Sequence, residues 1–459
     1  MIILNHNRRV HFIGIGGVGM SGLGELLLSL GFTVTGSDRQ SSSITARLET
    51  LGIRIRYDHI PALVMEADLV VYSSAIREDN PEWIYAKEHG IPMLRRAEML
   101  GEFMRMKFSI GVAGTHGKTT TTSLIGQLLH DAALHPTVIV GGILKRYESN
   151  AIVGTGEILV AEADEYDRSF LRMFPSIAVV TNIEADHLDC YSGLDDIKNA
   201  FVQFMNSTPF YGAVVACIDE PGVREVLTRC NRPLITYGLD READYHARGV
   251  TFADGKTRFA LYGKGERLAE ITLPLPGLHN VKNACAALAV AAELGIDIAG
   301  ASAGLAGFSG VRRRFEVVGR GRGITVIDDY AHHPSEIRAT LSAAKTAGFK
   351  RIVAVFQPHL YTRTRDFMDE FAESLCLADE IIVTAIYKSR EDPLPGVSAA
   401  TIVEKIERRG HGGARYVEKK ESIAPRLLPL LREGDGVIVM GAGDIWKVGQ
   451  QLAAGIHDA

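Results

Sequence analysis

The sequence predicts an α/β protein built from three successive units, each with a largely parallel sheet. Short apolar runs alternate with segments of helical periodicity, this pattern restarts twice, and two glycine-rich loops each stand between an apolar run and a helix. The chain has 459 residues, enough for three domains at about 100–200 residues each. The two restarts predict domains at residues 1–106, 107–312 and 313–459.

The elements of the first two units follow from their apolar patterns. Strands are predicted wherever a short apolar run ends in glycine or polar residues, at 10–15, 32–36, 69–72, 108–113, 158–161, 177–181 and 213–217. Helices are predicted where apolar residues recur at helical spacing, at 19–29, 118–131 and 283–294. Glycines interrupt the runs between residues 245 and 275, which indicates antiparallel hairpin strands at the edge of the second sheet.

The third unit repeats the pattern of strand and helix. Its strands are predicted at residues 324–327, 351–356, 380–384 and 437–440.

Composition excludes several classes of protein. Fifty basic against 55 acidic residues give a net charge of −5, which argues against a nucleic-acid partner. The five cysteines are scattered without a C-x-x-C pair, so neither a disulfide framework nor a structural zinc site is expected. No apolar run approaches the ~18 residues of a membrane helix, and the first residues lack the order of a signal peptide. We therefore expect a cytoplasmic protein without a membrane partner.

A first glycine-rich loop follows the strand predicted at 10–15. Gly14, Gly16 and Gly19 have the spacing G-x-G-x-x-G, and Asp38 lies at the end of the next predicted strand. Glycines there let backbone N–H groups approach a pyrophosphate, and the start of the following helix favours an anion. The pattern does not identify the ligand, because a nicotinamide cofactor, a flavin or a nucleotide sugar would each suit it.

A second glycine-rich loop follows the strand predicted at 108–113. Residues 113–122 read AGTHGKTTTT, and Gly-Lys-Thr between a strand and a helix forms the phosphate cradle of ATP-binding proteins. Position 112 is valine where the strict motif has glycine, so the loop is a compact variant. Lys118 is expected to neutralise the β- and γ-phosphates, and the Thr119 hydroxyl is expected to bind Mg²⁺.

Two phosphate-binding loops on two sheets indicate ATP on the second unit and another phosphorylated molecule on the first. The reaction is then expected to join or phosphorylate a substrate. A nicotinamide-dependent oxidoreductase would leave the second loop without a role. In a nucleotide-gated binding protein, the acidic and histidine residues that follow three other strands would have no role.

These acidic and histidine residues stand where parallel sheets place ligands. Glu162 and His187 follow neighbouring strands and could reach one Mg²⁺, although nitrogen is an unusual ligand for that ion. A third cluster, residues 328–334 (DDYAHHP), follows the strand predicted at 324–327. A polar stretch at 277–283 (GLHNVKN) lies upstream of it.

These segments give the chain a resemblance to a known family over essentially its whole length. Residues 114–119, 162–164, 181–187, 277–283, 313–316 and 328–334 resemble, in order, the motifs of the ATP-dependent Mur ligases of peptidoglycan synthesis. Residues 11–22 (HFIGIGGVGMSG) are similar to those of the family members that add alanine. The resemblance implies ligation of L-alanine to UDP-N-acetylmuramate through an acyl phosphate, with ATP and Mg²⁺.

The resemblance also implies a Rossmann-like N-terminal domain for the UDP-sugar, a central P-loop ATPase-type domain, and a C-terminal α/β domain for the amino acid and part of the ATP. The implied UDP-sugar residues are Gly14, Gly16, Gly17, Gly19, Met20, Ser21, Asp38 and Ser73. The implied ATP residues are Gly114, Thr115, His116, Gly117, Lys118, Thr119, Thr120, His279, Asn283 and Arg314. The implied amino-acid residues are Tyr330, His332 and Arg363. The implied metal ligands are Thr119, Glu162 and His187, and the implied catalytic residues are Lys118, His187 and His332.

One segment departs from the family pattern. Residues 357–363 read QPHLYTR, with Leu360 where the family often has arginine, so Arg363 is the expected clamp for the amino-acid carboxylate. An alternative within the family is a recycling ligase that adds a tripeptide to the same UDP-sugar, but its first loop usually looks different. The expected partners are small-molecule substrates, and the chain is expected to be a monomer or a homodimer.

Overall fold

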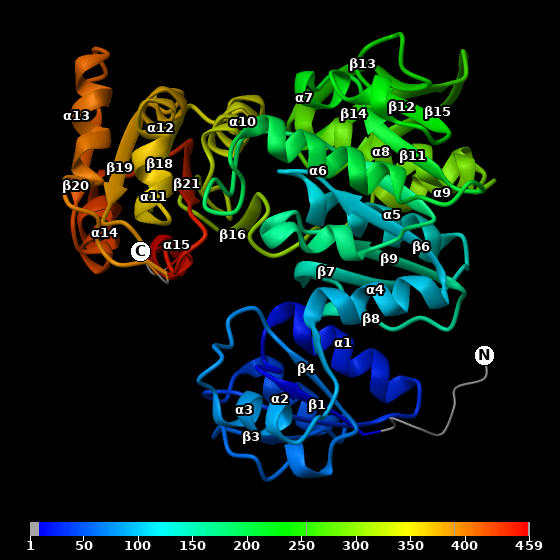
Figure 1. Ribbon diagram of the computed structural model, residues 1–459. Coiled ribbons are helices and arrows are strands. Elements are labelled where there is room, and N and C mark those ends of the chain that lie inside the picture. Colours follow the sequence, from blue (N-terminus) through cyan, green and yellow to red (C-terminus); the bar gives the residue numbers. More distant parts are fainter. Residues whose placement is uncertain (1–8, 254, 390, 458–459) are drawn as a thin grey trace. The chain divides into compact units, whose positions relative to one another are not determined.

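The computed structural model describes residues 9–253, 255–389 and 391–457, which form three sheets (Figure 1). The contacts divide the chain into two compact units. The first unit extends to Ser309, except for the segments Gly249–Phe259 and Thr272–Val281. The second unit consists of these two segments and the chain from Gly310 onward. In the described ranges, no helix has the length and apolar character needed to cross a membrane.

The N-terminal sheet has five parallel strands in the order β3-β2-β1-β4-β5. The strands are β1 (Arg9–Ile13), β2 (Thr33–Ser37), β3 (Arg54–Arg56), β4 (Leu69–Tyr72) and β5 (Met93–Arg95). The helices are α1 (Val18–Ser29), α2 (Ser43–Thr50), α3 (Pro81–Glu88) and α4 (Arg96–Met106), with a 3-10 turn η1 (Val64–Glu66). Because β2 and β4 lie on opposite sides of β1, the loop after β1 stands at the switch point where such sheets bind ligands.

The strand predicted at 10–15 ends at Ile13, because Gly14 has a φ of +83° that no extended strand allows. Helix α1 then packs on β7 (Thr137–Leu144) and β8 (Ser149–Ile152) of the next sheet (Figure 1). A Cβ on Gly22 would lie 2.9 Å from the Cβ of Ala151, so this close packing requires a glycine in the helix.

The central sheet has ten strands in the order β15-β14-β13-β12-β11-β10-β6-β9-β7-β8. The remaining strands are β6 (Phe108–Ala113), β9 (Ile158–Glu162), β10 (Ile177–Val180), β11 (Ala213–Cys217), β12 (Leu234–Gly238), β13 (Tyr245–Ala253), β14 (Lys256–Gly263) and β15 (Glu266–Leu273). The helices are α5 (Lys118–Asp131), α6 (Leu194–Asn206), α7 (Pro221–Arg224), α8 (Leu278–Glu293) and α9 (Ile298–Leu305), with 3-10 turns η2 (Tyr166–Arg172) and η3 (Leu227–Arg229).

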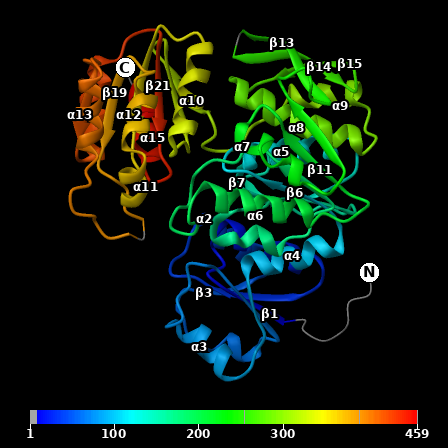
Figure 2. The same ribbon diagram turned by 45° about the horizontal axis from the view of Figure 1, so that its top comes forward.

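The expected edge of this sheet is confirmed, because β13, β14 and β15 follow one another at its end (Figure 2). Helix α8 begins at Leu278, earlier than the predicted start at residue 283. Strand β6 lies between β9 and β10, so the loop after β6 also stands at a switch point.

The C-terminal sheet has the order β16-β17-β21-β18-β19-β20, parallel except for β16 against β17. Its strands are β16 (Glu316–Gly321), β17 (Ile324–Asp329), β18 (Arg351–Phe356), β19 (Glu380–Thr384), β20 (Ala414–Val417) and β21 (Asp435–Met440). Its helices are α10 (Pro334–Thr346), α11 (Tyr361–Asp366), α12 (Met368–Leu375), α13 (Ala400–Arg408), α14 (Ile423–Leu427) and α15 (Trp446–His457), with 3-10 turns η4 (Lys420–Ser422) and η5 (Leu428–Leu430).

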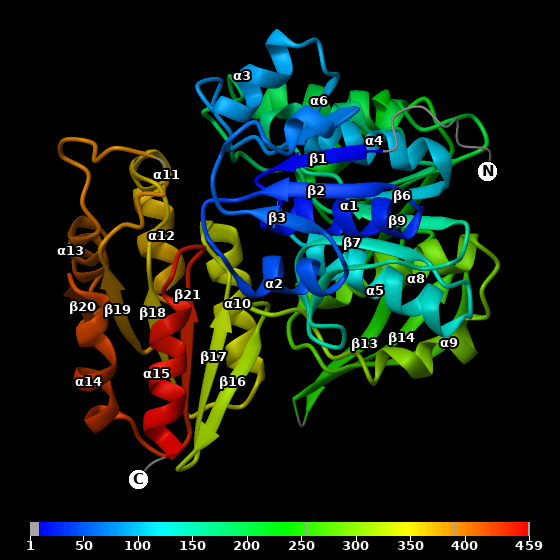
Figure 3. The same cartoon turned by 90° about the horizontal axis from the view of Figure 1, so that it is seen from below.

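Both faces of this sheet are buried, as parallel strands require. Val326 and Val439 pack with Leu452 of α15 on the face shown in Figure 3, whereas Ile327 packs with Ile337 of α10 on the other. The carboxyl ends of β17 and β18 are therefore held between two helical layers.

Candidate active site

The loop after β1 is folded back onto the end of β2. The carbonyl of Ser37 accepts hydrogen bonds from the N–H groups of Gly14 and Ile15, at 2.9 and 3.0 Å, and the Asp38 carboxylate accepts one from Gly16 at 2.8 Å. A Cβ on Gly16 would lie 2.8 Å from Asp38 Oδ2, so a side chain at this position would push that carboxylate away. Asp38, implied above as a UDP-sugar residue, thus holds the loop itself.

Two other side chains lie against this loop. A Cβ on Gly19 would lie 2.9 Å from Arg96 Nη1, and a Cβ on Gly14 would lie 3.5 Å from the Cβ of Ser73. Arg96 therefore brings a guanidinium to the first turn of α1, where a pyrophosphate is expected. No motif singled out Arg96, because it belongs to α4 and reaches α1 only through the fold.

Met20 and Ser21, two of the implied UDP-sugar residues, have side chains that are buried in the packing of α1. Met20 is 1% exposed and belongs to the hydrophobic core. The buried Ser21 hydroxyl lies 3.0 Å from the carbonyl of Val18 and 3.1 Å from Oδ1 of Asn150 on β8. In the structure these side chains fix α1, while the glycines, Gly17 included, carry the backbone of the loop.

The second loop is shaped by two glycines in unusual conformations. Gly114 has a φ of +143° and Gly117 a φ of +83°, and a Cβ on Gly114 would overlap Thr181 Oγ1. Thr181 donates its hydroxyl to the carbonyl of His116 at 2.6 Å, and the N–H of His116 donates to Asn182 Oδ1 at 2.7 Å. The end of β10 therefore holds the loop in place.

The threonines of the loop are largely enclosed. Thr115, Thr119 and Thr120 are 8%, 4% and 8% exposed. Thr115 Oγ1 accepts a hydrogen bond from the N–H of Glu184 at 2.9 Å. Thr119 and Thr120 lie in the first turn of α5, as expected for the threonine of a phosphate cradle.

The Lys118 ammonium is held by a buried carboxylate. Its Nζ donates to Glu165 Oε2 at 2.7 Å and to the carbonyl of Gly114 at 2.6 Å. Burial lowers the pKa of Lys118, but the charges of Glu165 and Asp164 outweigh this effect and raise it. Burial raises the pKa of Glu165, as does the charge of Asp164, while Lys118 opposes the rise. The pair therefore keeps a fixed cation inside the loop.

One group of side chains beside this pair could hold a metal ion. Ligand atoms of Asp164, Glu165 and His187 all lie within 4.8 Å of one another. Glu162, predicted as the companion of His187, lies outside this group and accepts a hydrogen bond from the N–H of Gly141 at 2.6 Å. The carboxylates suit Mg²⁺, which prefers oxygen ligands, and the imidazole suits it less.

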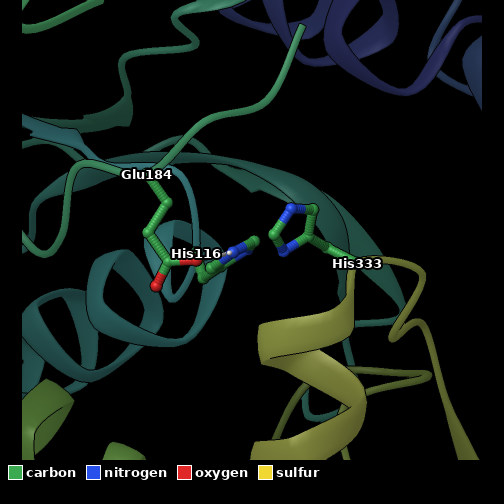
Figure 4. A group of neighbouring side chains, drawn as sticks. All are labelled: His116, Glu184 and His333. Atoms are coloured by element: carbon green, nitrogen blue, oxygen red, sulfur yellow. Dashed lines mark ion pairs between the residues drawn. The ribbon is translucent and has the colours of Figure 1, made fainter. Parts of the chain in front are cut away.

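His116 and Glu184 stand together at the side of the loop. His116 Nε2 lies 3.5 Å from Glu184 Oε2 (Figure 4). A Cβ on Gly117 would lie 2.6 Å from Oδ1 of Asn283, so Asn283, which the resemblance places near the adenosine, adjoins the loop. His279 lies one turn earlier in α8.

A third set of side chains follows β17. The guanidinium carbons of Arg313 and Arg314 lie 5.0 and 5.1 Å from the centre of the Tyr330 ring, and the His332 ring meets that ring edge-on at 5.3 Å. His332 Nδ1 lies 3.0 Å from the carbonyl of Tyr330 and 3.1 Å from a Glu336 oxygen. These contacts fix the orientation of the His332 ring.

Arg363 extends this set from α11, the helix that follows β18. It is 7% exposed, and its Nη1 lies 3.4 Å from His359 Nδ1. The His359 ring lies 6.0 Å from that of His332 and stacks at 5.7 Å on Tyr387, which follows β19. The His359 side chain thus lies between the predicted site residues His332 and Arg363. Neither His359 nor Tyr387 had a role predicted from the sequence, and both belong to this set of side chains.

Three family models match successive parts of the chain. The Mur ligase family catalytic domain matches residues 9–108, the Mur ligase middle domain 112–291, and the Mur ligase glutamate ligase domain 313–443. These ranges follow the order of the three sheets.

Known proteins are similar over nearly the full length. The chain is 48% identical over 451 residues to the UDP-N-acetylmuramate–L-alanine ligase of Geotalea daltonii, covering 98% of each chain. The crystal structure of the UDP-N-acetylmuramate–alanine ligase from Thermotoga maritima has a TM-score of 0.81 at 32% identity, covering 97% of this chain and 98% of that one. A murein peptide ligase from Psychrobacter arcticus has a TM-score of 0.70 at 26% identity, covering 98% and 99%.

Proposed function

We start from the fact that this chain belongs to the Mur ligase family, and we propose that it joins L-alanine to the lactyl carboxylate of UDP-N-acetylmuramate. The reaction consumes ATP and gives UDP-N-acetylmuramoyl-L-alanine, ADP and phosphate. Identity of 48% to an alanine ligase across 98% of both chains supports these substrates. In the structure, the observation that carries the proposal is the partly buried Lys118, held by the buried Glu165 in a second glycine-rich loop on a different sheet from the first.

The first chemical step activates a carboxylate, which is a poor electrophile. Transfer of the γ-phosphoryl group of ATP to a lactyl oxygen gives an acyl phosphate and releases ADP. Such a transfer depends mainly on alignment and charge neutralisation. Lys118, positioned by Glu165, brings the cation to the phosphates. Bound Mg²⁺ would neutralise further phosphate charge, held by the Thr119 hydroxyl and by carboxylates among residues 162–165.

In the second step, the neutral amine of alanine attacks the acyl carbon and phosphate leaves, while the amine gives up a proton. His332 is suited to accept that proton, because its Nδ1 faces the Tyr330 carbonyl and Glu336 and its Nε2 is the nitrogen left for a substrate. Arg363 binds the α-carboxylate of alanine, in a pocket bounded by Tyr330 and His332.

The UDP-sugar binds at the first loop in this proposal. Backbone N–H groups in the first turn of α1 and the Arg96 guanidinium meet the pyrophosphate, while the hydrogen bonds of Gly14, Ile15 and Gly16 to the end of β2 hold the loop. We place the three substrates in domains 1–106, 107–312 and 313–459, and the reaction in the cytoplasm. Small molecules are the only partners we propose, with no nucleic acid or membrane, and the chain acts as a monomer or homodimer.

The decisive experiment measures phosphate release with ATP, Mg²⁺ and UDP-N-acetylmuramate, adding L-alanine, glycine, L-serine or the recycled tripeptide in turn. Release that requires the UDP-sugar and is fastest with L-alanine supports the proposal. Release with the tripeptide alone would assign the chain to the recycling ligases. Oxidation or reduction of a nicotinamide cofactor would instead assign it to the oxidoreductases.

A further inference from the structure

We propose that Glu82 is a positioning residue for the UDP-sugar, acting through Ser37 on the first glycine loop. The inference rests on the proposed function, because it concerns the same ligand, and it assigns a role to a residue that no motif contains. Glu82 lies in the first turn of α3, and its side chain is 1% exposed.

The Glu82 carboxylate is surrounded by polar side chains. Its Oε2 accepts a hydrogen bond from the Ser37 hydroxyl at 2.5 Å and lies 2.9 Å from His59 Nδ1. Its Oε1 lies 3.3 Å from His11 Nε2, and His11 Nδ1 in turn lies 2.8 Å from Thr35 Oγ1. The carboxylate therefore ties β1, β2 and the chain after β3 to α3.

The partners of this carboxylate favour its charged form. Burial raises the pKa of Glu82, but the nearby His11 ring and the hydrogen bonds with Ser37 and His59 together bring it below its usual range. A buried carboxylate needs such partners, because an unpaired charge in a protein interior is strongly unfavourable. An apolar residue would fill a core without this demand, so stability alone is a weak reason for the arrangement.

The position of Ser37 connects the carboxylate to the loop. Ser37 ends β2, and its carbonyl accepts the N–H groups of Gly14 and Ile15, while the next residue, Asp38, accepts the N–H of Gly16. Fixing the Ser37 side chain therefore fixes the strand end that three loop N–H groups depend on. These hydrogen bonds hold the loop in place, and a small displacement of the loop is enough to weaken binding of a ligand beside it.

The test uses the full chain with Glu82→Gln and Ser37→Ala. Both variants should raise the KM for UDP-N-acetylmuramate about tenfold, the effect of one displaced charge-assisted hydrogen bond. Their kcat and their KM for ATP and for alanine should stay within about twofold of the unaltered chain. Calorimetric titration with UDP-N-acetylmuramate alone should show the same loss of affinity. Ser37→Ala is the milder change and keeps the test valid should Glu82→Gln fold poorly.

Glu25→Gln is the matched control. Glu25 is also a buried carboxylate of the N-terminal domain, but it lies on α1 and pairs with Arg47 at 2.9 Å. This variant should change thermal stability and leave all three KM values unchanged. The inference is overturned if Ser37→Ala and Glu82→Gln bind the UDP-sugar normally, if they raise all KM values equally, or if Glu25→Gln has the same selective effect.

The two proposals fail in distinguishable ways. An unaltered chain that binds UDP-N-acetylmuramate without ligating alanine contradicts the proposed function, and the titrations still test Glu82. An unaltered chain that does not bind this ligand overturns the inference. An unaltered chain that ligates normally, with variants that bind normally, overturns the inference alone.

Discussion

Lys118 and Glu165 form a coupled pair, so removing the lysine has two separable consequences. Lys118→Ala should lower the rate of phosphate release by about 10²–10³, the usual effect of losing a preorganised charge. It should also lower the free energy of unfolding by about 3–5 kcal/mol, because the buried Glu165 carboxylate loses its ammonium partner. Adding Glu165→Gln should restore stability, measured by urea titration, without restoring the rate. Near-normal turnover by a folded double variant would remove this loop from the active site.

Arg363 is expected to act on one substrate only. Arg363→Ala should lower kcat/KM for alanine on the order of 10–100-fold, which corresponds to about 1.5–3 kcal/mol for a charge-assisted contact. Titrations with ATP and UDP-sugar should stay nearly unchanged. Arg365→Ala is the control, because Arg365 is exposed and pairs with Asp366 at 2.7 Å. A selective loss from Arg365→Ala instead would move the carboxylate clamp to that residue.

Asp328 should make stability depend on pH. Burial raises its pKa to about 6, although Arg313 Nε lies 3.3 Å away and opposes the rise. Between about pH 4 and pH 6 the folded chain retains a proton that the unfolded chain releases, so this group lowers the free energy of unfolding as the pH rises. Asp328→Asn should remove that dependence, worth up to about 3 kcal/mol above pH 6. Urea titrations from pH 4 to pH 7 should show the two chains diverging, and a constant difference would contradict the assignment.

Single residues differ in how readily the sequence reveals them. Lys118 and the glycines were predictable, because their motifs depend on local spacing between a strand and a helix. Arg96, Glu165 and Glu82 reach their partners from other elements. Their contacts depend on tertiary packing, which cannot be inferred from the spacing of residues along the chain.

The turn between β1 and α1 provides a test at the level of an element. Gly16→Ala and Gly19→Ala place a Cβ 2.8 Å from Asp38 Oδ2 and 2.9 Å from Arg96 Nη1, so both should displace groups at the loop. We expect KM for the UDP-sugar to rise about tenfold or more, with KM for ATP unchanged. Gly24→Ala, in α1, is the control. It places a Cβ 3.7 Å from Ile15 Cδ1, an ordinary contact distance, and should leave both KM values unchanged. Equal effects on both substrates would contradict separate sites.

Buried elements were predicted better than edge elements. Strands such as β4 and β6 are short apolar runs, and they lie where these runs predicted them. The edge strand β3 contains the exposed Arg54 and Arg56, and the edge strand β20 contains the exposed Arg415 and Tyr416, so neither stands out from its neighbours in sequence. An edge strand is buried less completely, and its residues carry less of the periodicity on which prediction depends.

At the scale of the whole molecule, two restarts of the pattern predicted three units, and the structure has three sheets. The two loops for which the sequence predicted phosphate binding both follow central strands, where such sheets bind ligands, and their phosphate chemistry stays a prediction. The boundaries at residues 106 and 312 stay a prediction. Composition alone could not separate the units, because each has the same mixture of buried strands and amphipathic helices.

Assigning each substrate to its own sheet predicts independence between distant variants. Gly19→Ala and Arg363→Ala lie on the first and third sheets and concern different substrates, so their effects should multiply, within about 0.5 kcal/mol or about twofold. The measurement is phosphate release at low UDP-sugar and low alanine for the two single variants and the double variant. Lys118→Ala with Glu165→Gln serves as the contrast, because these residues are in contact and their effects on stability should not add. A combined effect of Gly19→Ala and Arg363→Ala far from the product would show that the UDP-sugar and alanine sites are coupled, against the division of labour among the three sheets.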